Sequence, residues 1–206
     1  MKIPAVILAG GLSTRMGRPK ALEVIGGIRL IDRVAQVVRA QADPVLLNAN
    51  DPAIRIDGAE TIADRHSGFK GPLAGIQAGL ANLAARRPEA SHALFVPVDC
   101  PFLPDDLAAR MVAAIRSGTT IVLARSRGQT HPVCGLWPIA LATELDGWLS
   151  ELRSLRLWDF LEGREVVTVD FDDRRIGDEL VDPFFNVNTP ADLAQARQLL
   201  GGHYHG

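Results

Sequence analysis

Short apolar runs alternate with longer amphipathic stretches along this chain of 206 residues. The apolar runs predict strands, and the stretches with hydrophobic side chains every three or four positions predict helices. Alternation of the two is typical of βαβ units wound around a mainly parallel sheet. The expected strands are Val6–Leu8, Val45–Asn48, Leu94–Pro97, Ile121–Ala124, Val166–Asp170 and Phe185–Val187.

Helical spacing of apolar residues predicts three helices, and a capping signal predicts a fourth. In the fourth, Thr189 suits the N-cap, Pro190 suits the first helical position, and Asp192 follows the cap by three residues. The fold expected is α/β: a single three-layer domain over residues 1–200 with a mainly parallel, Rossmann-like sheet. Within it, residues from about 125 to 185 should be less regular and form a rim for a second substrate, and residues 201–206 form a tail. The three periodic stretches are Leu30–Val38, Leu73–Leu83 and Leu107–Ile115.

Composition narrows the functional class. Hydrophobic residues make up 47% and charged residues 22%, which is ordinary for a globular protein. The net charge of −2 provides no global basic field to recruit nucleic acid. No apolar run approaches the roughly 18 residues of a membrane span, and the first strand comes too early for a secretory signal. Cys100 and Cys134 share no metal-ligand spacing and indicate no disulfide framework. A cytoplasmic protein without nucleic-acid or membrane partners is expected.

The segment Ile7–Lys20, ILAGGLSTRMGRPK, is a glycine-rich loop that leaves an apolar strand. Gly10 and Gly11 permit close backbone approach, so that peptide N–H groups can face an anion. Arg15 and Lys20 add a planar fork and a point charge for phosphate oxygens. The loop lacks the Lys-Ser or Lys-Thr pair of a Walker A motif and does not fit the dinucleotide fingerprint. We interpret it as a cradle for a nucleoside triphosphate; the alternative is a tight turn with solvated cations.

Polar residues follow several of the expected strands at their carboxyl ends, where open α/β sheets bind ligands. Asp99 could hold Mg²⁺, which takes one or two carboxylates together with substrate phosphates. Its alternative role is to cap the turn before the helix at Leu107. Asp64 could accept hydrogen bonds from a ribose or base, and Asn48 offers both donors and an acceptor to a base edge. Either could instead be a turn-forming residue.

His131, in the segment THPVCGLW, could touch an anionic substrate. A single histidine is more often an ordinary hydrogen-bonded residue, and that alternative stays open here. No Ser-His-Asp or Cys-His arrangement supports covalent hydrolase chemistry.

Taken together, these segments resemble the molybdenum cofactor guanylyltransferases of the nucleotidyltransferase superfamily. The first motif is shared with sugar and isoprenoid nucleotidyltransferases, whereas LAGG, GPLAG and NVNTP favour the guanylyl enzymes. Pro19 departs from the pattern, because many relatives carry an acidic residue there. The resemblance implies a fold of the nucleotide-diphospho-sugar transferase type. The matching segments occur in family order from about residue 7 to residue 196: LAGGLSTRMGRPK, LLNAN, GPLAGI, PVDCPFLP, HPVCGLW and FNVNTPADL.

The resemblance also implies roles for individual residues. Asp99 would bind both the nucleotide and Mg²⁺, and with Arg15 and Lys20 it would form the catalytic set. Asn186 and Asn188 would lie near the pterin substrate, although a polar strand end beside a helix cap also favours asparagine. The nucleotide would be bound by Leu8, Ala9, Gly10, Lys20, Asn48, Asp64 and Asp99.

The implied reaction transfers GMP from GTP to the terminal phosphate of molybdopterin, or of its molybdenum-loaded form, and releases pyrophosphate. Mg²⁺ is the expected cofactor, and molybdoenzyme chaperones or apo-molybdoenzymes are the expected recipients of the product. One alternative is a nucleotidyltransferase with another base or acceptor, such as a cytidylyl enzyme for the same pterin or a sugar-1-phosphate enzyme. The other is a non-catalytic GTP-binding module.

Overall fold

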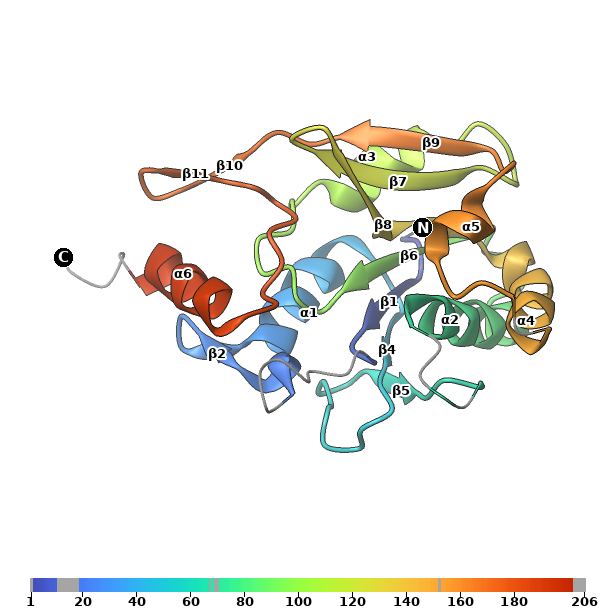
Figure 1. Cartoon of the computed structure of the whole chain (residues 1–206), viewed down its shortest axis with the longest axis horizontal. Coiled ribbons are helices and arrows are strands. Elements are labelled where there is room, and N and C mark those ends of the chain that lie inside the picture. The colour runs from blue at the N-terminus through green and yellow to red at the C-terminus, as the bar shows by residue number, and fades with distance from the viewer. Residues whose placement is uncertain (1, 11–18, 67, 69–70, 152, 202–206) are drawn as a thin grey trace.

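A seven-stranded sheet forms the centre of the computed structural model, which describes residues 2–10, 19–66, 68, 71–151 and 153–201 (Figure 1). The strands are β1 (Ala5–Leu8), β4 (Val45–Asn48), β5 (Glu60–Ile62), β6 (His92–Pro97), β7 (Ile121–Ser126), β8 (Gln129–Pro138) and β9 (Val166–Asp170). They lie in the order β5-β4-β1-β6-β8-β7-β9. Strand β8 runs antiparallel to both of its neighbours, and every other pairing in this sheet is parallel.

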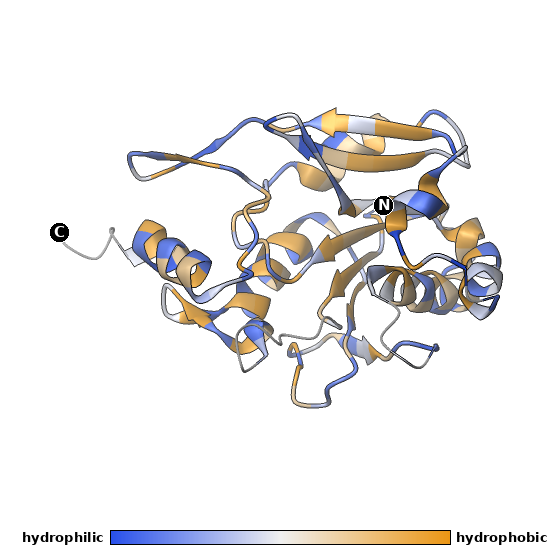
Figure 2. Cartoon of the chain, in the orientation of Figure 1, coloured by the Kyte–Doolittle hydropathy of each residue, from blue (hydrophilic) through white to orange (hydrophobic). Residues whose placement is uncertain are grey.

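Helices cover both faces of the sheet, because its buried strands carry apolar side chains on both sides. In β1, Ile7 packs on one face with helices α1 (Leu30–Gln41) and α3 (Leu107–Ala113). Val6 packs on the opposite face with α2 (Pro72–Arg86), α4 (Ala142–Ser150) and α5 (Leu157–Leu161). Figure 2 shows the resulting hydrophobic colouring of the central strands. The predicted three-layer α/β fold is confirmed.

A third, smaller core lies beside the sheet. It joins α6 (Pro190–Gly201) to the hairpin of β2 (Val24–Ile25) and β3 (Ile28–Arg29), which lie together at the left of Figure 1. A second hairpin, β10 (Arg174–Ile176) with β11 (Glu179–Val181), projects above them. The remaining elements are the 3₁₀ helices η1 (Lys20–Leu22) and η2 (Ile139–Leu141). Within the described ranges, every helix is too short or too polar to span a bilayer.

Helix α2 packs closely on the sheet because two of its buried positions are glycines. A Cβ atom at Gly79 would lie 2.7 Å from Cε1 of Phe95 and 2.9 Å from Cγ2 of Val6. A Cβ atom at Gly75 would lie 2.9 Å from Cδ2 of Leu8 and would collide with the side chain of Asn48. The first turns of α2 therefore pack directly against the carboxyl ends of β1 and β4.

The four predicted helices and five of the six predicted strands are present, with ends that differ by a few residues. The prediction of a strand at Phe185–Val187 is wrong. This segment pairs with no strand, but the backbone N–H of Val187 donates to the carbonyl of Asp99 at 2.9 Å. Its alternating pattern reflects a segment that runs beside the end of β6.

The expectation that residues 125–185 are less regular is also wrong, because they supply β8, a central strand of the sheet. The sequence obscured β8 because Pro132 interrupts its pattern, and proline cannot donate to a ladder. The structure accommodates it with a bulge: Leu123 pairs with Gly135 and Ala124 pairs with His131, so residues 132–134 lie outside the regular pairing. The expected tail lies outside the described residues from 202 onward.

Candidate functional site

A cavity of about 450 Å³ opens where β1, β4 and β6 end. It extends to the first turns of α2 on one side and to the bulge of β8 on the other. Gly11 and Arg15, both predicted for the phosphate cradle, lie outside the described residues. Every other residue predicted for the site lines this cavity: Leu8, Ala9, Gly10, Lys20, Asn48, Asp64, Asp99, Asn186 and Asn188.

Asn48 and Asp64 form a hydrogen-bonded group with Asn50 at one end of the cavity. The side-chain amide of Asn48, which is 1% exposed, donates to Oδ1 of Asp64 at 2.9 Å. Asn50 donates to Oδ2 of Asp64 at 2.8 Å and accepts from its backbone N–H at 2.9 Å. Asp64 is thus more than a turn-forming residue, because both of its carboxylate oxygens hold neighbouring amides in place. A Cβ atom at Gly10 would lie 3.3 Å from Oδ1 of Asn48, so glycine keeps the floor of this end open.

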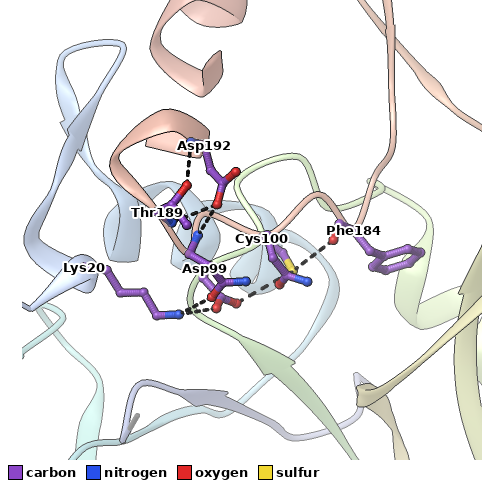
Figure 3. A network of polar contacts seen from close by, with 8 residues as sticks. Lys20, Asp99, Cys100, Phe184, Thr189 and Asp192 are labelled. Atoms are coloured by element: carbon purple, nitrogen blue, oxygen red, sulfur yellow. Dashed lines mark hydrogen bonds and ion pairs between the residues drawn. The ribbon is translucent and has the colours of Figure 1, made fainter. Parts of the chain in front are cut away.

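Lys20 and Asp99 meet in the middle of the cavity, although 79 positions separate them in sequence (Figure 3). Nζ of Lys20 lies 2.5 Å from Oδ2 of Asp99, and their side chains are 20% and 13% exposed. The ammonium also donates to Oδ1 of Asn188 at 3.0 Å. Asp99 does not cap the helix at Leu107, whose N-cap residue is Asp106. Lys20 can therefore bind an anionic ligand, and Asp99 can bind the cation that accompanies it.

Asn188 is held in the site by the cap of α6. Its backbone N–H donates to Oδ2 of Asp192 at 2.9 Å, and the N–H of Thr189 donates to the same oxygen at 2.8 Å. The N–H of Asp192 in turn donates to Oγ1 of Thr189 at 3.2 Å, which completes the predicted capping box. Burial would raise the pKa of Asp192, but these hydrogen bonds outweigh it and lower that pKa. The side chain of Asn188 faces Lys20 while its backbone belongs to the cap.

Asn186 is linked to the strand end through a thiol. Sγ of Cys100 donates to Oδ1 of Asn186 at 3.2 Å, and a weaker contact of 3.8 Å joins it to the carbonyl of Phe184. Burial, aided by the neighbouring Asp99, raises the pKa of Cys100. Burial likewise raises the pKa of Cys134. Both thiols are therefore neutral at physiological pH, and neither acts as a thiolate nucleophile.

Asp99 is compatible with a metal ion that arrives with a nucleotide. The described part of the chain contains no group of three or more histidine, cysteine, aspartate or glutamate side chains placed to hold a metal. Mg²⁺ typically keeps several waters and takes one or two carboxylates plus substrate phosphates, so it does not need such a group. One carboxylate in a cavity that can admit phosphates fits this donor set.

Two features of the site were not predicted from the sequence: the contact of Asn50 with Asp64, and the lining formed by the β8 bulge, of which only His131 was considered. Asn50 did follow a strand end, but nothing in the sequence indicated that it pairs with Asp64. The stretch Thr130–Cys134 lines the cavity through the bulge of β8. The signal for it was Pro132 inside an otherwise strand-like run, which favours a bulge over a break in the strand.

Comparisons with known proteins show the family of this chain. A family model described as "MobA-like NTP transferase domain" matches residues 5–167. The molybdenum cofactor guanylyltransferase of Rhizobium meliloti (strain 1021) is 46% identical over 200 residues, which cover 96% of this chain and 91% of that protein.

Two solved structures share the fold at lower identity. Molybdopterin-guanine dinucleotide biosynthesis protein A from Archaeoglobus fulgidus has a TM-score of 0.77 and 23% identity, and the match covers 97% of this chain and 100% of that one. A Mycobacterium tuberculosis H37Rv protein, solved in complex with manganese, has a TM-score of 0.66 and 18% identity, with 96% and 99% coverage.

Proposed function

This chain is a nucleotidyltransferase that belongs to the MobA-like NTP transferases and, among them, to the molybdenum cofactor guanylyltransferases, and from this premise we propose that it transfers GMP from GTP to molybdopterin. The acceptor is the terminal phosphate of molybdopterin or of its molybdenum-loaded form. The products are molybdopterin guanine dinucleotide and pyrophosphate.

One observation supports the proposal above the others: the carboxyl ends of β1, β4 and β6 deliver complementary groups to one cavity. In the proposal, Asn48 and Asp64 bind the nucleoside, and the backbone at Leu8–Gly10 runs beneath it. Lys20 binds the phosphates at the centre, and Arg15 is expected to do the same. Asn188, which accepts a hydrogen bond from Lys20, and Asn186, which accepts one from Cys100, face the acceptor.

The transfer forms one P–O bond and breaks another. An oxygen of the acceptor phosphate attacks the α-phosphorus of GTP, the bond from that phosphorus to the bridging oxygen breaks, and pyrophosphate leaves with the electron pair. The nucleophile is already an anion, so no side chain has to remove a proton. The difficulty is the approach of like charges and the charge that develops on the leaving group. Lys20 addresses both by its position, and electrostatic stabilisation of this kind is a large term in phosphoryl transfer.

We propose that Asp99 binds a divalent cation, Mg²⁺, together with the nucleotide phosphates. A bound metal ion contributes positive charge beside the phosphate oxygens. Lys20 forms an ion pair with Asp99 and holds the carboxylate in place within a largely buried site. Binding of GTP then gives Lys20 a phosphate partner and releases Asp99 for the cation.

The test is a product assay with purified protein, molybdopterin and Mg²⁺. With GTP we expect release of pyrophosphate that depends on the acceptor, together with a guanylylated pterin detected by mass spectrometry. CTP in place of GTP should react at least about tenfold more slowly, in line with the discrimination that one base-specific contact provides. Faster transfer with CTP, or binding of GTP without any transfer, would overturn the proposal. Delivery to molybdoenzyme chaperones or apo-molybdoenzymes belongs to the same proposal and can be followed by transfer of the labelled product.

A further inference from the structure

Three polar side chains form a hydrogen-bonded chain beneath the β8 side of the cavity. Nε2 of His131 lies 2.7 Å from Oγ of Ser126, and this hydroxyl donates to Oδ1 of Asp182 at 2.7 Å. The same carboxylate oxygen accepts the backbone N–H of Phe184 at 2.9 Å. Ser126 is 1% exposed, whereas His131 is half-buried and lines the cavity. The three residues come from β8, β7 and the segment after β11.

The directions of these hydrogen bonds determine the tautomer of His131. An ionised carboxylate only accepts hydrogen bonds, so the single proton of the Ser126 hydroxyl goes to Asp182. The hydroxyl oxygen must then accept from His131, which places the imidazole proton on Nε2. Burial lowers the pKa of His131, although the nearby Asp182 opposes this shift, and the ring is neutral at physiological pH. Nδ1 of His131 therefore carries a lone pair.

Packing holds the ring in this orientation. The rings of His131 and Phe184 have centroids 4.8 Å apart and are inclined by 33°. Because Nε2 is bonded to Ser126, Nδ1 is the remaining polar atom of a side chain that lines the cavity. No residue in the described ranges forms a hydrogen bond with Nδ1. A fixed acceptor in a ligand cavity is typical of a group that reads a donor on the ligand.

The position of His131 indicates which ligand it contacts. Contacts lead from Lys20 to Asp99, on to Cys100, and from Cys100 to Phe184, and Figure 3 shows these residues spread in that order. Because His131 packs on Phe184, it lies beyond the phosphate centre and away from the Asn48 end. The neighbouring lining from Pro132 to Cys134 carries no charge. An uncharged surface with one fixed acceptor suits a flat heterocycle that bears N–H donors.

We propose that Nδ1 of His131 accepts a hydrogen bond from an N–H group of the acceptor's pterin, and that Ser126 and Asp182 position the ring for this contact. The inference rests on the proposed function, because it assigns a specificity residue for the second substrate of that reaction. It requires the imidazole to be neutral and to carry its proton on Nε2.

Three substitutions distinguish the contribution of Nδ1 of His131 from that of Nε2. The amide of His131→Gln reaches the position of Nε2 and can keep the Ser126 contact, but it leaves nothing at Nδ1. In His131→Asn the amide oxygen is bonded to Cγ, as Nδ1 is in histidine, so it can replace that nitrogen as acceptor. Ser126→Ala removes the group that sets the tautomer. Each full-length variant is assayed with GTP and molybdopterin varied in turn, and its thermal midpoint is recorded.

We expect His131→Gln to raise the KM for molybdopterin by about tenfold, the change expected for one lost hydrogen bond, with the KM for GTP within about twofold of wild type. His131→Asn should raise the molybdopterin KM less than His131→Gln does. Ser126→Ala should raise it in the wild-type background and have little further effect in the His131→Gln background, because the positioned atom is already gone. A purely structural role would instead change both KM values and the thermal midpoint together.

The outcomes also distinguish this inference from the proposed function. A wild-type enzyme that guanylylates molybdopterin, with His131→Gln showing an unchanged molybdopterin KM, overturns the inference alone. A larger effect of His131→Asn than of His131→Gln also contradicts it, because the Nε2 side would then be the one that matters. A wild-type protein that transfers no GMP to molybdopterin overturns the proposed function and this inference with it.

Discussion

The two ends of the cavity are built from different kinds of strand. The β4 end, lined by Gly10, Asn48 and Asp64, is formed by parallel strands that finish at one edge of the sheet. The β8 end, lined by residues 130–134, is formed by the bulge of an antiparallel strand that passes through the sheet in the opposite direction. Lys20 and Asp99 lie between them. At the β4 end, the polar residues follow the carboxyl ends of parallel strands. At the β8 end, the bulge of one strand forms the surface of the cavity.

This difference in construction is matched by a difference in chemistry. The β4 end and the centre contain carboxylates, amides and an ammonium, which suit a charged and hydrogen-bonding nucleotide. The β8 end carries no charge while His131 is neutral. Behind it, His131, Ser126 and Asp182 are hydrogen-bonded to one another. Substitutions at the two ends should therefore separate the kinetic constants of the two substrates, and those in the centre should affect both.

The largest effect is expected for Lys20→Ala. The substitution removes the positive charge at the centre and leaves the Asp99 carboxylate, which is 13% exposed, without its cation. Loss of a preorganised electrostatic group at a reacting phosphate lowers the rate by about 10²-fold or more. The measurement is kcat/KM for pyrophosphate release with each substrate varied in turn, and both values should fall.

Lys2→Ala provides a matched control for the loss of a lysine. Nζ of Lys2 donates to the backbone carbonyls of Arg39 and Ala40, at the last turn of α1 and away from the cavity. Its kinetic constants should equal those of the wild type. Normal turnover by Lys20→Ala, measured beside this control, would show that the centre is not where the phosphates bind.

Asp64→Asn should act on the β4 end alone. The carboxylate accepts hydrogen bonds from the amides of both Asn48 and Asn50, and an asparagine at this position can accept from only one of them. Its own N–H₂ group would face the other donor. Loss of the part-buried hydrogen bond from Asn48 costs about 2 kcal/mol, which corresponds to about a 30-fold increase in the KM for GTP. The KM for molybdopterin should stay within about twofold, and an equal increase in both constants would contradict the division of the cavity into two ends.

Gly75→Ala tests whether the close approach of α2 positions the same end. The added methyl group would collide with the Asn48 side chain and would lie 2.9 Å from Cδ2 of Leu8. Overpacking of this kind costs about 1–3 kcal/mol, part of which should appear as an increase of about tenfold in the KM for GTP. Gly147→Ala in α4 is the control, because a Cβ atom there has no neighbour within 4 Å. The control should keep full activity and gain about 0.5–1 kcal/mol of stability in urea unfolding. An unchanged GTP KM in Gly75→Ala would mean that Asn48 can move without consequence.

The same contrast explains what could be predicted from the sequence. Strand ends could be recognised because a polar residue that follows an apolar run lies at the carboxyl edge of a parallel sheet, and this placed Asn48 and Asp99 at one edge. Asp64 follows β5 (Glu60–Ile62), a strand that was not predicted. The β8 end could not be read in this way. Pro132 and Gly135 interrupt the pattern of that strand, and its neighbours in the sheet come from distant parts of the chain. The hydrogen bonds of His131 depend on long-range packing, which single-sequence periodicity does not record.

The smallest effect is expected for Asp192→Asn, which tests how Asn188 is held. Asparagine can still accept from the N–H groups of Asn188 and Thr189, so mainly the negative charge at the start of α6 is lost. Such a charge contributes about 0.3–1 kcal/mol near a helix N-terminus. The pKa of Asp192 is lowered on folding, so its stabilising effect is present above the unfolded pKa of about 3.9 and is lost as the pH falls through the folded value. Urea unfolding should therefore show wild type more stable than Asp192→Asn at pH 7 and the two proteins converging below about pH 4. A difference that persists in acid would show that geometry, not charge, maintains the cap, and a changed GTP KM would show that the cap also supports the β4 end.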